Sequence, residues 1–298
     1  MLDLLVRMLQ VDFWARKFKG MNNVVILLYH SPQTNIFELH LEYLHRNYNF
    51  ISLVQLVDAI HKKDWDSIPK NAIVITFDDG HISNYKLLEL FKQYKIKPTI
   101  YLVSGIICTN NKFWWQEELG SVEKQPLKYL ANKERLKVIE DNKIESQRIN
   151  NSPVALTGAQ IREMSPFVDF QSHTHNHPII TMLDEDELEV ELKSPIKILR
   201  NHNLEVNHFA YPNGDYGIRE IKYLKRCGYL SARTTDIGWN NISTDPFLLK
   251  VMGISDNASI PKLRLQISGI FGWVLHILIS KNIFGRKKII SKGRYNGQ

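Results

Sequence analysis

The chain has 298 residues, of which 44% are hydrophobic, 10% aromatic and 23% charged. This is the composition of a globular protein, and it excludes a mainly disordered chain because there are enough apolar residues for a core. The length fits either two domains or one large α/β barrel with additions.

The formal net charge of +7 is distributed unevenly along the chain. Residues 281–298 hold six Lys or Arg and no acid, and residues 1–20 hold four basic and two acidic residues. Residues 21–280 therefore carry a net charge of −1. A nucleic-acid binder would show basic strips with aromatics across its body, so the basic balance does not indicate a nucleic-acid partner.

An amphipathic helix is predicted over residues 1–21, where polar residues recur at helical spacing opposite Leu, Met and Phe. We expect this helix either to pack on the main domain or to lie on a membrane surface. The segment lacks the order of basic region, apolar run and small-residue cleavage site that marks a secretory signal. Cys108 and Cys227 make no disulfide framework. These features predict a cytoplasmic protein, with peripheral contact at the inner face of the membrane as an option.

Residues 22–255 alternate short apolar runs with amphipathic helical stretches, a pattern typical of a parallel α/β architecture. The expected strands are 24–29, 72–77, 99–103, 168–172, 206–210 and 229–233. The expected helices are 37–47, 53–62, 83–95, 157–164, 184–201 and 216–227. Pro195 is expected to kink or split its helix, because proline lacks the backbone N–H and clashes with the preceding turn.

Two segments fall outside this alternation. Residues 105–152 are charged and have a largely helical pattern, which indicates an insertion on a loop. The C-terminal extension, 256–298, contains an apolar stretch at 265–280 that is shorter than the roughly 20 residues a membrane-spanning helix needs. We expect this apolar and then basic extension either to contact an anionic membrane surface or to pack on the barrel.

The string T-F-D-D-G at 76–80 follows the apolar run 72–75. Two adjacent carboxylates at a strand end repel each other unless a cation or a proton relieves them. One of the two can bind a metal while its neighbour stays free as a base. Asp78 and Asp79 fall at the carboxyl end of a strand, which is the active-site face of an α/β barrel. A solvated turn is the alternative.

A second string, S-H-T-H-N-H-P at 172–178, follows the apolar run 168–170. In an extended chain His173, His175 and His177 point to one face, whereas in a turn His173 and His177 converge. In either case two imidazoles and an Asp oxygen make a two-His-one-carboxylate set with a position open for water. An exposed histidine cluster is the alternative.

Together T-F-D-D-G and H-T-x-x-H-P resemble the first two motifs of the polysaccharide deacetylases, carbohydrate esterase family 4 with the NodB-homology fold. The resemblance covers about residues 22–255 and implies a distorted (β/α) barrel. It implies that Asp78 is the general base. It also implies that Asp79, His173 and His177 bind a divalent metal, with zinc preferred and Co, Ni or Mn as alternatives.

The stretch F-A-Y-P-N-G-D-Y at 209–216 is similar to the third motif of the family, in which a backbone N–H helps to bind the oxyanion. The resemblance assigns this role to Tyr211 and places Pro212 beside the substrate. The arginine usual in the family is Ala210 here, which leaves the partner of Asp78 open. The poly-N-acetylglucosamine branch of the family also tends to read F-A-Y-P at this place.

The C-terminal catalytic histidine of the family is absent, since the only histidine after Lys250 is His276 in the apolar tail. In the poly-N-acetylglucosamine branch, a histidine that closes the first strand supplies the acid, and the resemblance assigns this role to His30. The insertion carries Trp114 and Trp115, which either stack on a sugar ring or pack the loop down.

The resulting prediction is a metal-dependent hydrolase that removes the N-acetyl group from an amino sugar in a polysaccharide, an oligosaccharide or a lipid-linked saccharide. The alternatives are a deformylase or another C–N hydrolase on the same fold, and a non-catalytic sugar-binding relative. The expected partners are the acylated saccharide and a membrane surface, without nucleic acid. The sequence does not set the oligomeric state.

Overall fold

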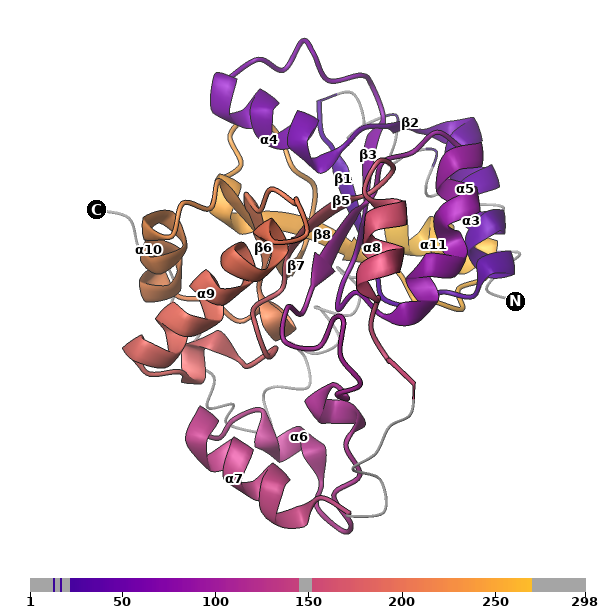
Figure 1. Ribbon diagram of the computed structural model, residues 1–298. Helices are drawn as coiled ribbons and strands as arrows, with labels where there is room; N and C mark the ends of the chain where they lie inside the picture. Colours follow the sequence, from indigo (N-terminus) through magenta and orange to yellow (C-terminus); the bar gives the residue numbers. More distant parts are fainter. Residues whose placement is uncertain (1–12, 14–16, 18–21, 145–151, 270–298) are drawn as a thin grey trace, which may run out of the picture.

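The protein is a closed parallel barrel surrounded by helices (Figure 1). The computed structural model describes residues 13, 17, 22–144 and 152–269. Within these residues, seven strands form the barrel: β1 (Val25–Tyr29), β3 (Ala72–Phe77), β4 (Thr99–Leu102), β5 (Asp169–Ser172), β6 (His208–Ala210), β7 (Ser231–Ile237) and β8 (Leu249–Gly253). Strand β1 pairs with both β3 and β8 and so closes the barrel. The predicted (β/α) barrel is confirmed.

The register of the strands brings their carboxyl ends to one rim. Strands β1 and β3 end in the pair of Tyr29 and Phe77, so His30 and Asp78 leave the barrel side by side. Strand β5 ends directly before His173. Because the strands are parallel, these three residues start from the same end of the barrel, where active sites of α/β barrels form.

Helices cover the outside of the barrel (Figure 1). Those in the expected places are α3 (Thr34–Asn47), α4 (Leu53–Lys62), α5 (Leu88–Gln93) after the 3₁₀ turn η1 (Ile82–Leu87), α8 (Gly158–Met164), α9 (Glu185–Arg200) and α10 (Ile218–Arg226). Capping boxes begin α4, α8 and α9 and satisfy backbone donors at their first turns.

A kink or a split was predicted at Pro195; helix α9 is one helix through this residue, so it is not split. Leu192 before the proline and Leu199 after it are both completely buried. Burial on both sides of the proline stabilises the helix by more than the loss of one backbone hydrogen bond weakens it.

Strand β1 illustrates how the core is built. Every residue of this strand is buried, as is typical of parallel strands covered on both faces. Val25 and Leu27 belong to one hydrophobic cluster, and Ile26 and Leu28 to another. Successive side chains therefore point to opposite faces of the barrel wall.

Two strands were not predicted from the sequence. Strand β2 (Asn49–Phe50) pairs only with the first two residues of β3. Strand β8 reads L-K-V-M-G, and pairing with β1 and β7 fixes it as the last strand of the barrel. Strands β6 and β7 also begin two residues later than predicted. These differences follow from pairing partners that are distant in sequence.

A helical lobe lies between β4 and β5 and appears below the barrel in Figure 1. It contains the 3₁₀ turn η2 (Trp114–Gln116), α6 (Lys124–Leu127) and α7 (Asn132–Asn142). Leu119, Leu127 and Ile139 form a small core of its own, against which Trp114 packs. The lobe falls within the segment 105–152 that the sequence marked as a helical insertion.

Helix α11 (Ile260–Ile267) follows β8 and contacts α3. Among the described residues, no helix is both long and apolar enough to cross a bilayer. Almost all of the predicted N-terminal helix, and the tail from residue 270, lie outside the described residues. The expectations for them stay predictions.

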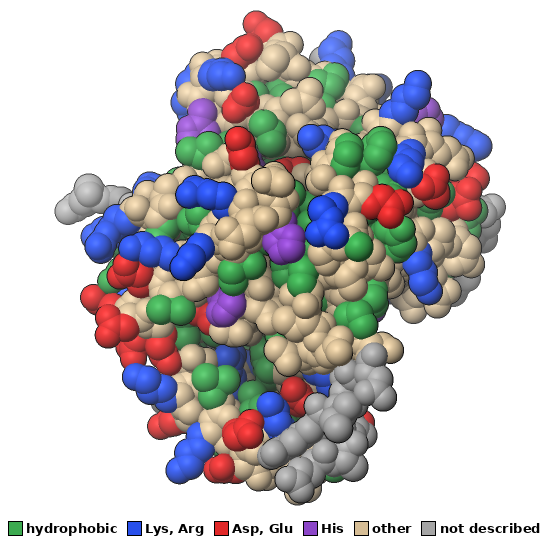
Figure 2. All heavy atoms as spheres, viewed as in Figure 1, with side chains coloured by type: hydrophobic (Ala, Val, Ile, Leu, Met, Phe, Trp, Pro, Cys, Tyr) green, Lys and Arg blue, Asp and Glu red, His purple; other side chains and the backbone are tan. Residues whose placement is uncertain are grey.

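The face of the molecule in Figure 2 carries both signs of charge. Figure 2 shows Lys and Arg side chains interspersed with Asp and Glu over the barrel and over the lobe. This distribution agrees with the near-neutral balance of residues 21–280.

Candidate active site

Two loops at the carboxyl ends of β3 and β5 carry the predicted metal site. The Asp78 N–H donates a hydrogen bond to the carbonyl of Tyr29 at 3.0 Å, and the His173 N–H donates to the carbonyl of Leu102 at 2.9 Å. The first bond extends the pairing of β1 with β3 by one residue, and the second extends the pairing of β4 with β5. The two loops are therefore anchored to the barrel immediately before they turn into the site.

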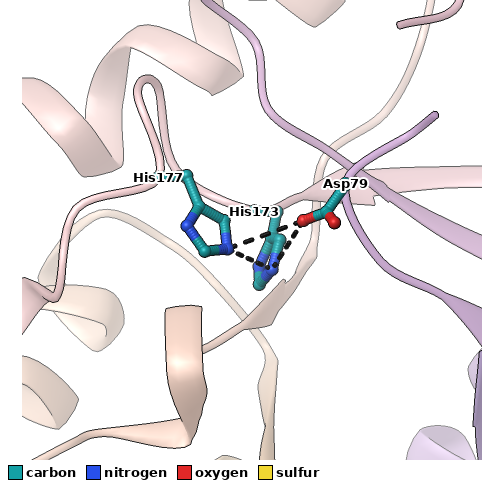
Figure 3. A group of neighbouring side chains, drawn as sticks. All are labelled: Asp79, His173 and His177. Atoms are coloured by element: carbon teal, nitrogen blue, oxygen red, sulfur yellow. Dashed lines mark hydrogen bonds and ion pairs between the residues drawn. The ribbon is translucent and has the colours of Figure 1, made fainter. Parts of the chain in front are cut away.

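Asp79, His173 and His177 point toward one another (Figure 3). The Nε2 atoms of the two histidines are 3.1 Å apart. Asp79 Oδ1 lies 3.7 Å from His173 Nε2 and 3.6 Å from His177 Nε2. Two imidazole nitrogens and one carboxylate oxygen at these separations fit a tetrahedral divalent cation and leave one position open.

Hydrogen bonds orient the imidazole of His173 and fix the backbone of His177. His173 Nδ1 donates to the carbonyl of Ala210 at 2.8 Å, which leaves its Nε2 unprotonated toward the site. The His177 N–H donates to Thr174 Oγ1 at 2.9 Å, and the Thr174 hydroxyl donates to the His173 carbonyl.

The backbone at two of the three residues is in a sparsely populated conformation. Asp79 has a φ of 71° and His177 a φ of 54°, in the left-handed region that non-glycine residues rarely adopt. Backbone strain of this kind is concentrated at functional sites.

Burial keeps both histidines neutral, which is the form that binds a metal. It lowers the pKa of His173 to about 4 and lowers the pKa of His177 well below its usual value. Burial also raises the pKa of Asp79 to about 7. A cation between the three side chains would oppose this rise, because it stabilises the carboxylate form.

Asp78 forms a buried ion pair with Arg233. Arg233 Nη2 donates to the two carboxylate oxygens of Asp78 at 2.5 and 2.6 Å. Burial is the largest influence on the pKa of Asp78 and raises it, but the charge of Arg233, the charges of nearby histidines and the hydrogen bond from Arg233 together outweigh burial, so the pKa lies below its usual value. Asp78 Oδ2 is 3.8 Å from His173 Nε2. An ionised carboxylate therefore lies beside the three-residue cluster.

His30 follows β1 and lines the same cavity as Asp78. The backbone N–H groups of His30 and Ser31 donate to the two carboxylate oxygens of Asp256, at 3.1 and 3.0 Å. The Asn84 side-chain amide donates to the His30 carbonyl at 2.8 Å. Asp256 follows β8, so its carboxylate ties two neighbouring strand ends together and fixes the backbone of His30.

Glu191 of α9 holds the loop between His173 and His177. Its Oε2 accepts hydrogen bonds from the N–H groups of His175 and Asn176, both at 2.8 Å, and its Oε1 accepts from the Asn176 side chain at 2.9 Å. His175 is not part of the cluster, since its Nδ1 contacts Ser104 Oγ at 3.0 Å. The loop is thus the turn, not the extended chain, of the two conformations that the sequence left open.

A cavity of about 510 Å³ lies over the cluster. Its walls include His30, Asp78 and the cluster on the barrel side, and Trp114 and Trp115 from the lobe. The Trp115 ring stacks on Phe113 at 4.8 Å and lies 4.4 Å from the His177 ring. Trp114 Nε1 donates to the His177 carbonyl at 3.1 Å. Both indoles therefore line the cavity and also pack against the site.

Comparison with known proteins identifies the family. The family described as Polysaccharide deacetylase matches residues 66–232, which is more than half of the chain. The chain belongs to the polysaccharide deacetylase family. It is similar to YxkH of Bacillus subtilis, a protein named for the same family, with 22% identity over 224 residues. This match covers 72% of the chain but 64% of YxkH, so the chain spans less than two thirds of that relative.

Solved structures share the barrel fold. The Streptococcus pyogenes deacetylase PplD in complex with acetate has a TM-score of 0.61 and 22% identity, covering 83% of this chain and 98% of PplD. A de-N-acetylase from Aggregatibacter actinomycetemcomitans has a TM-score of 0.60 and 19% identity, covering 82% and 100%. IcaB from Ammonifex degensii has a TM-score of 0.59 and 18% identity, covering 83% and 97%.

In this polysaccharide deacetylase family member, the missing arginine of the third motif has a substitute on the next strand. Ala210, where the family usually has arginine, is paired with Arg233 across β6 and β7. Arg233 reaches Asp78 from there. The sequence offered one signal, an arginine as the last residue of the predicted strand 229–233. That this arginine contacts Asp78 is shown only by the closed barrel.

The structure places two residues of the third motif differently from what the resemblance implied. The Tyr211 N–H, expected to bind the oxyanion, donates to the Arg233 carbonyl at 3.0 Å because it continues the β6–β7 pairing. Pro212, expected beside the substrate, is buried and is not part of the cavity lining, whereas Asn213 and Thr235 are. In this motif the residue that lines the cavity is therefore Asn213, directly after the proline.

Proposed function

We propose that this protein is a metal-dependent hydrolase that removes the N-acetyl group from an amino sugar and releases acetate. The observation that carries the proposal is the position of Asp78, ionised and 3.8 Å from His173, beside a three-residue cluster that fits a divalent cation. All four side chains line one cavity. Membership in the polysaccharide deacetylase family supports an N-acylated saccharide as the substrate.

Asp79, His173 and His177 would hold the cation, for which we propose zinc, with Co, Ni or Mn as alternatives. A donor set of two imidazoles and one carboxylate, with a fourth position open, is typical of catalytic zinc. When bound, the cation supplies positive charge that polarises the amide carbonyl and favours loss of a proton from water.

The proton transfers fall to two residues of the chain. Asp78 takes the proton of the water that attacks the acetyl carbonyl, and Arg233 keeps this carboxylate ionised at neutral pH. His30 gives a proton to the amine as the C–N bond breaks. The oxygen of water ends in acetate, and the sugar keeps a free amine.

We further propose that the chain belongs with the poly-N-acetylglucosamine branch of the family. Three features support this: F-A-Y-P in the third motif, His30 directly after β1, and the lack of any histidine between Lys250 and His276. The substrate is then an N-acetylhexosamine in a polysaccharide, an oligosaccharide or a lipid-linked saccharide. Trp114 and Trp115 give the cavity an apolar wall suited to a sugar ring.

Acetate release from N-acetylglucosamine oligomers, before and after treatment with a chelator and after readdition of zinc, tests this proposal. Asp78→Asn is expected to lower kcat by about a hundredfold or more, because general base catalysis contributes about 10²–10⁴-fold. Its zinc content should stay unchanged. Asp58→Asn is the matched control, since Asp58 is an exposed residue of α4 paired with Lys62.

Formate released from N-formylated sugars in place of acetate would identify a deformylase. Full activity of Asp78→Asn would remove Asp78 from the mechanism. Absence of both metal and activity in the native protein would contradict the proposal as a whole.

A further inference from the structure

Two lysines of the lobe line the cavity over the cluster. Lys124 is the first residue of α6, and Lys128 follows its last residue. Residues four apart on a helix lie on the same face. Both lysines share the cavity lining with Asp78 and Asp79. The lobe therefore contributes two positive charges to the site.

Each of these lysines has hydrogen-bond donors to spare. Lys124 Nζ donates to the Trp115 carbonyl at 2.8 Å, and Lys128 Nζ donates to Asn213 Oδ1 at 3.3 Å. An ammonium group has three donors, so each can still bind a ligand. In the part of the chain that the structure describes, neither lysine forms a salt bridge with a carboxylate.

The carboxylates in and near the cavity do not pair with these lysines. Asp78 is paired with Arg233, and Asp79 belongs to the cluster that fits a divalent cation. Asp215 accepts a hydrogen bond from the side-chain amide of Asn213, whose oxygen contacts Lys128. An amide thus lies between Asp215 and the lysine. The two ammonium groups are the positive charges of the cavity that lack a carboxylate partner.

We propose that the substrate carries an oxyanion close to its acylated amino sugar, and that Lys124 and Lys128 bind this group. The inference rests on the proposed function and specifies its substrate class. Ammonium groups act as point charges, which suits a phosphate. No arginine is among the described residues of the cavity lining to give carboxylates a bidentate partner. We therefore expect a phosphate ester to be preferred over a carboxylate.

The size of the cavity agrees with a sugar that carries a charged substituent. Its volume of about 510 Å³ lies within the range of about 300–1,000 Å³ that small-molecule sites span. Trp114 and Trp115 line the cavity together with the lysines, so an apolar wall and two cations occur in one site.

Three substrates of matched length test the inference: a neutral N-acetylglucosamine oligomer, the same oligomer with a phosphate ester, and one with a carboxylate. We expect kcat/KM for acetate release to be about tenfold higher for the phosphorylated than for the neutral oligomer at low salt. Attraction between charges is screened by salt, so this ratio should fall as ionic strength rises.

The double variant Lys124→Gln/Lys128→Gln is expected to bring the ratio of the phosphorylated to the neutral substrate close to one. Lys124→Arg/Lys128→Arg keeps both charges and should keep the preference. Lys137→Gln is the control for a lost charge on the same lobe, because Lys137 is exposed on α7 and is not part of the cavity lining. An unchanged ratio in the Gln double variant would overturn the inference, as would equal use of neutral and phosphorylated oligomers by the native protein.

Binding measured through tryptophan fluorescence separates this inference from the proposed function. If no substrate releases acetate, the proposed function is wrong. The inference then stands or falls on whether the phosphorylated oligomer binds more tightly than the neutral one and loses that advantage in the Gln double variant. A preference for the carboxylated oligomer over the phosphorylated one would overturn the choice of phosphate.

Discussion

At the scale of single residues, the charge of Asp78 depends on one completely buried arginine. Arg233 is 0% exposed and its Nη2 contacts both oxygens of Asp78. Burial is the largest influence on the pKa of Asp78 and raises it, and Arg233 supplies the largest opposing influence. The arginine therefore decides over which pH range Asp78 can act as a base.

Arg233→Met should shift the acid limb of the activity profile to higher pH, since the pKa of Asp78 is then raised by burial without an opposing charge. The free energy of unfolding should also fall, by about 3–5 kcal/mol at neutral pH, because a buried carboxylate is left unpaired. The pH dependence of kcat/KM and urea denaturation measure the two effects. An acid limb at the native pH would show that Arg233 does not set the charge of Asp78.

Two variants test the position of this arginine. Arg219→Met is the control, because Arg219 is partly exposed and pairs with Glu220. It should leave the acid limb in place. Arg233→Ala combined with Ala210→Arg moves the guanidinium to the paired residue on β6. This double variant should recover part of the activity that Arg233→Ala alone loses.

Gly214, in the turn after β6, packs against Thr235 of the cavity lining and has no room for a side chain. It has a φ of +78°, and an added Cβ would lie 1.9 Å from Thr235 Oγ1. Gly214→Ala should therefore lower the stability by the cost of a left-handed alanine, about 1–2 kcal/mol, and by about 1–3 kcal/mol more for overpacking. Urea denaturation measures the sum.

Gly228→Ala isolates the steric part of that loss. Gly228 also has a positive φ, of +91°, but an added Cβ would meet nothing within 4 Å. Gly228→Ala should therefore lower the stability only by the cost of a left-handed alanine. Equal losses in the two alanine variants would mean that the contact with Thr235 relaxes without cost.

At the scale of elements, helix α9 positions the loop that carries His173 and His177. Glu191 is 6% exposed and receives three hydrogen bonds from His175 and Asn176. These two residues lie between His173 and His177. The helix therefore holds the turn in which the two imidazoles converge.

Glu191→Ala should weaken zinc binding by about 10–100-fold, the usual effect of removing a group that orients metal ligands. Competition with a chromophoric chelator measures the affinity, and circular dichroism checks that the fold persists. Glu189→Ala, at a partly exposed residue of the same helix that pairs with Lys193, should leave the affinity unchanged. If both variants bind zinc like the native protein, α9 does not position the ligands.

At the scale of the whole molecule, the net charge and the chemistry belong to different parts of the chain. The six basic residues of 281–298 would contribute roughly 1 kcal/mol each at an anionic membrane surface. We predict that the full chain floats with anionic liposomes and that a chain ending at residue 269 does so much less. Replacing the six basic residues by Gln should act like the truncation. Equal flotation of all three would exclude the tail from membrane contact.

The sequence by itself determined the barrel class, six of its strands and three side chains that the structure brings together in one cluster. Apolar runs of strand length and adjacent polar motifs are local signals, and Asp79, His173 and His177 each directly follow such a run or its loop. Strand β8 lacked such a local signal, because its identity depends on pairing with β1 and β7.

Only the tertiary structure decided which other residues contact the residues of these motifs. Arg233 contacts Asp78, 155 positions away, and Asp256 binds the backbone of His30, 226 positions away. Lys124 and Lys128 reach the cavity because the lobe folds over it. In the closed barrel the Tyr211 N–H donates to the Arg233 carbonyl, whereas the motif alone had suggested that it binds the oxyanion. Such contacts form because the ends of several strands meet at one rim of the barrel. They cannot be predicted from residues that are neighbours in the sequence.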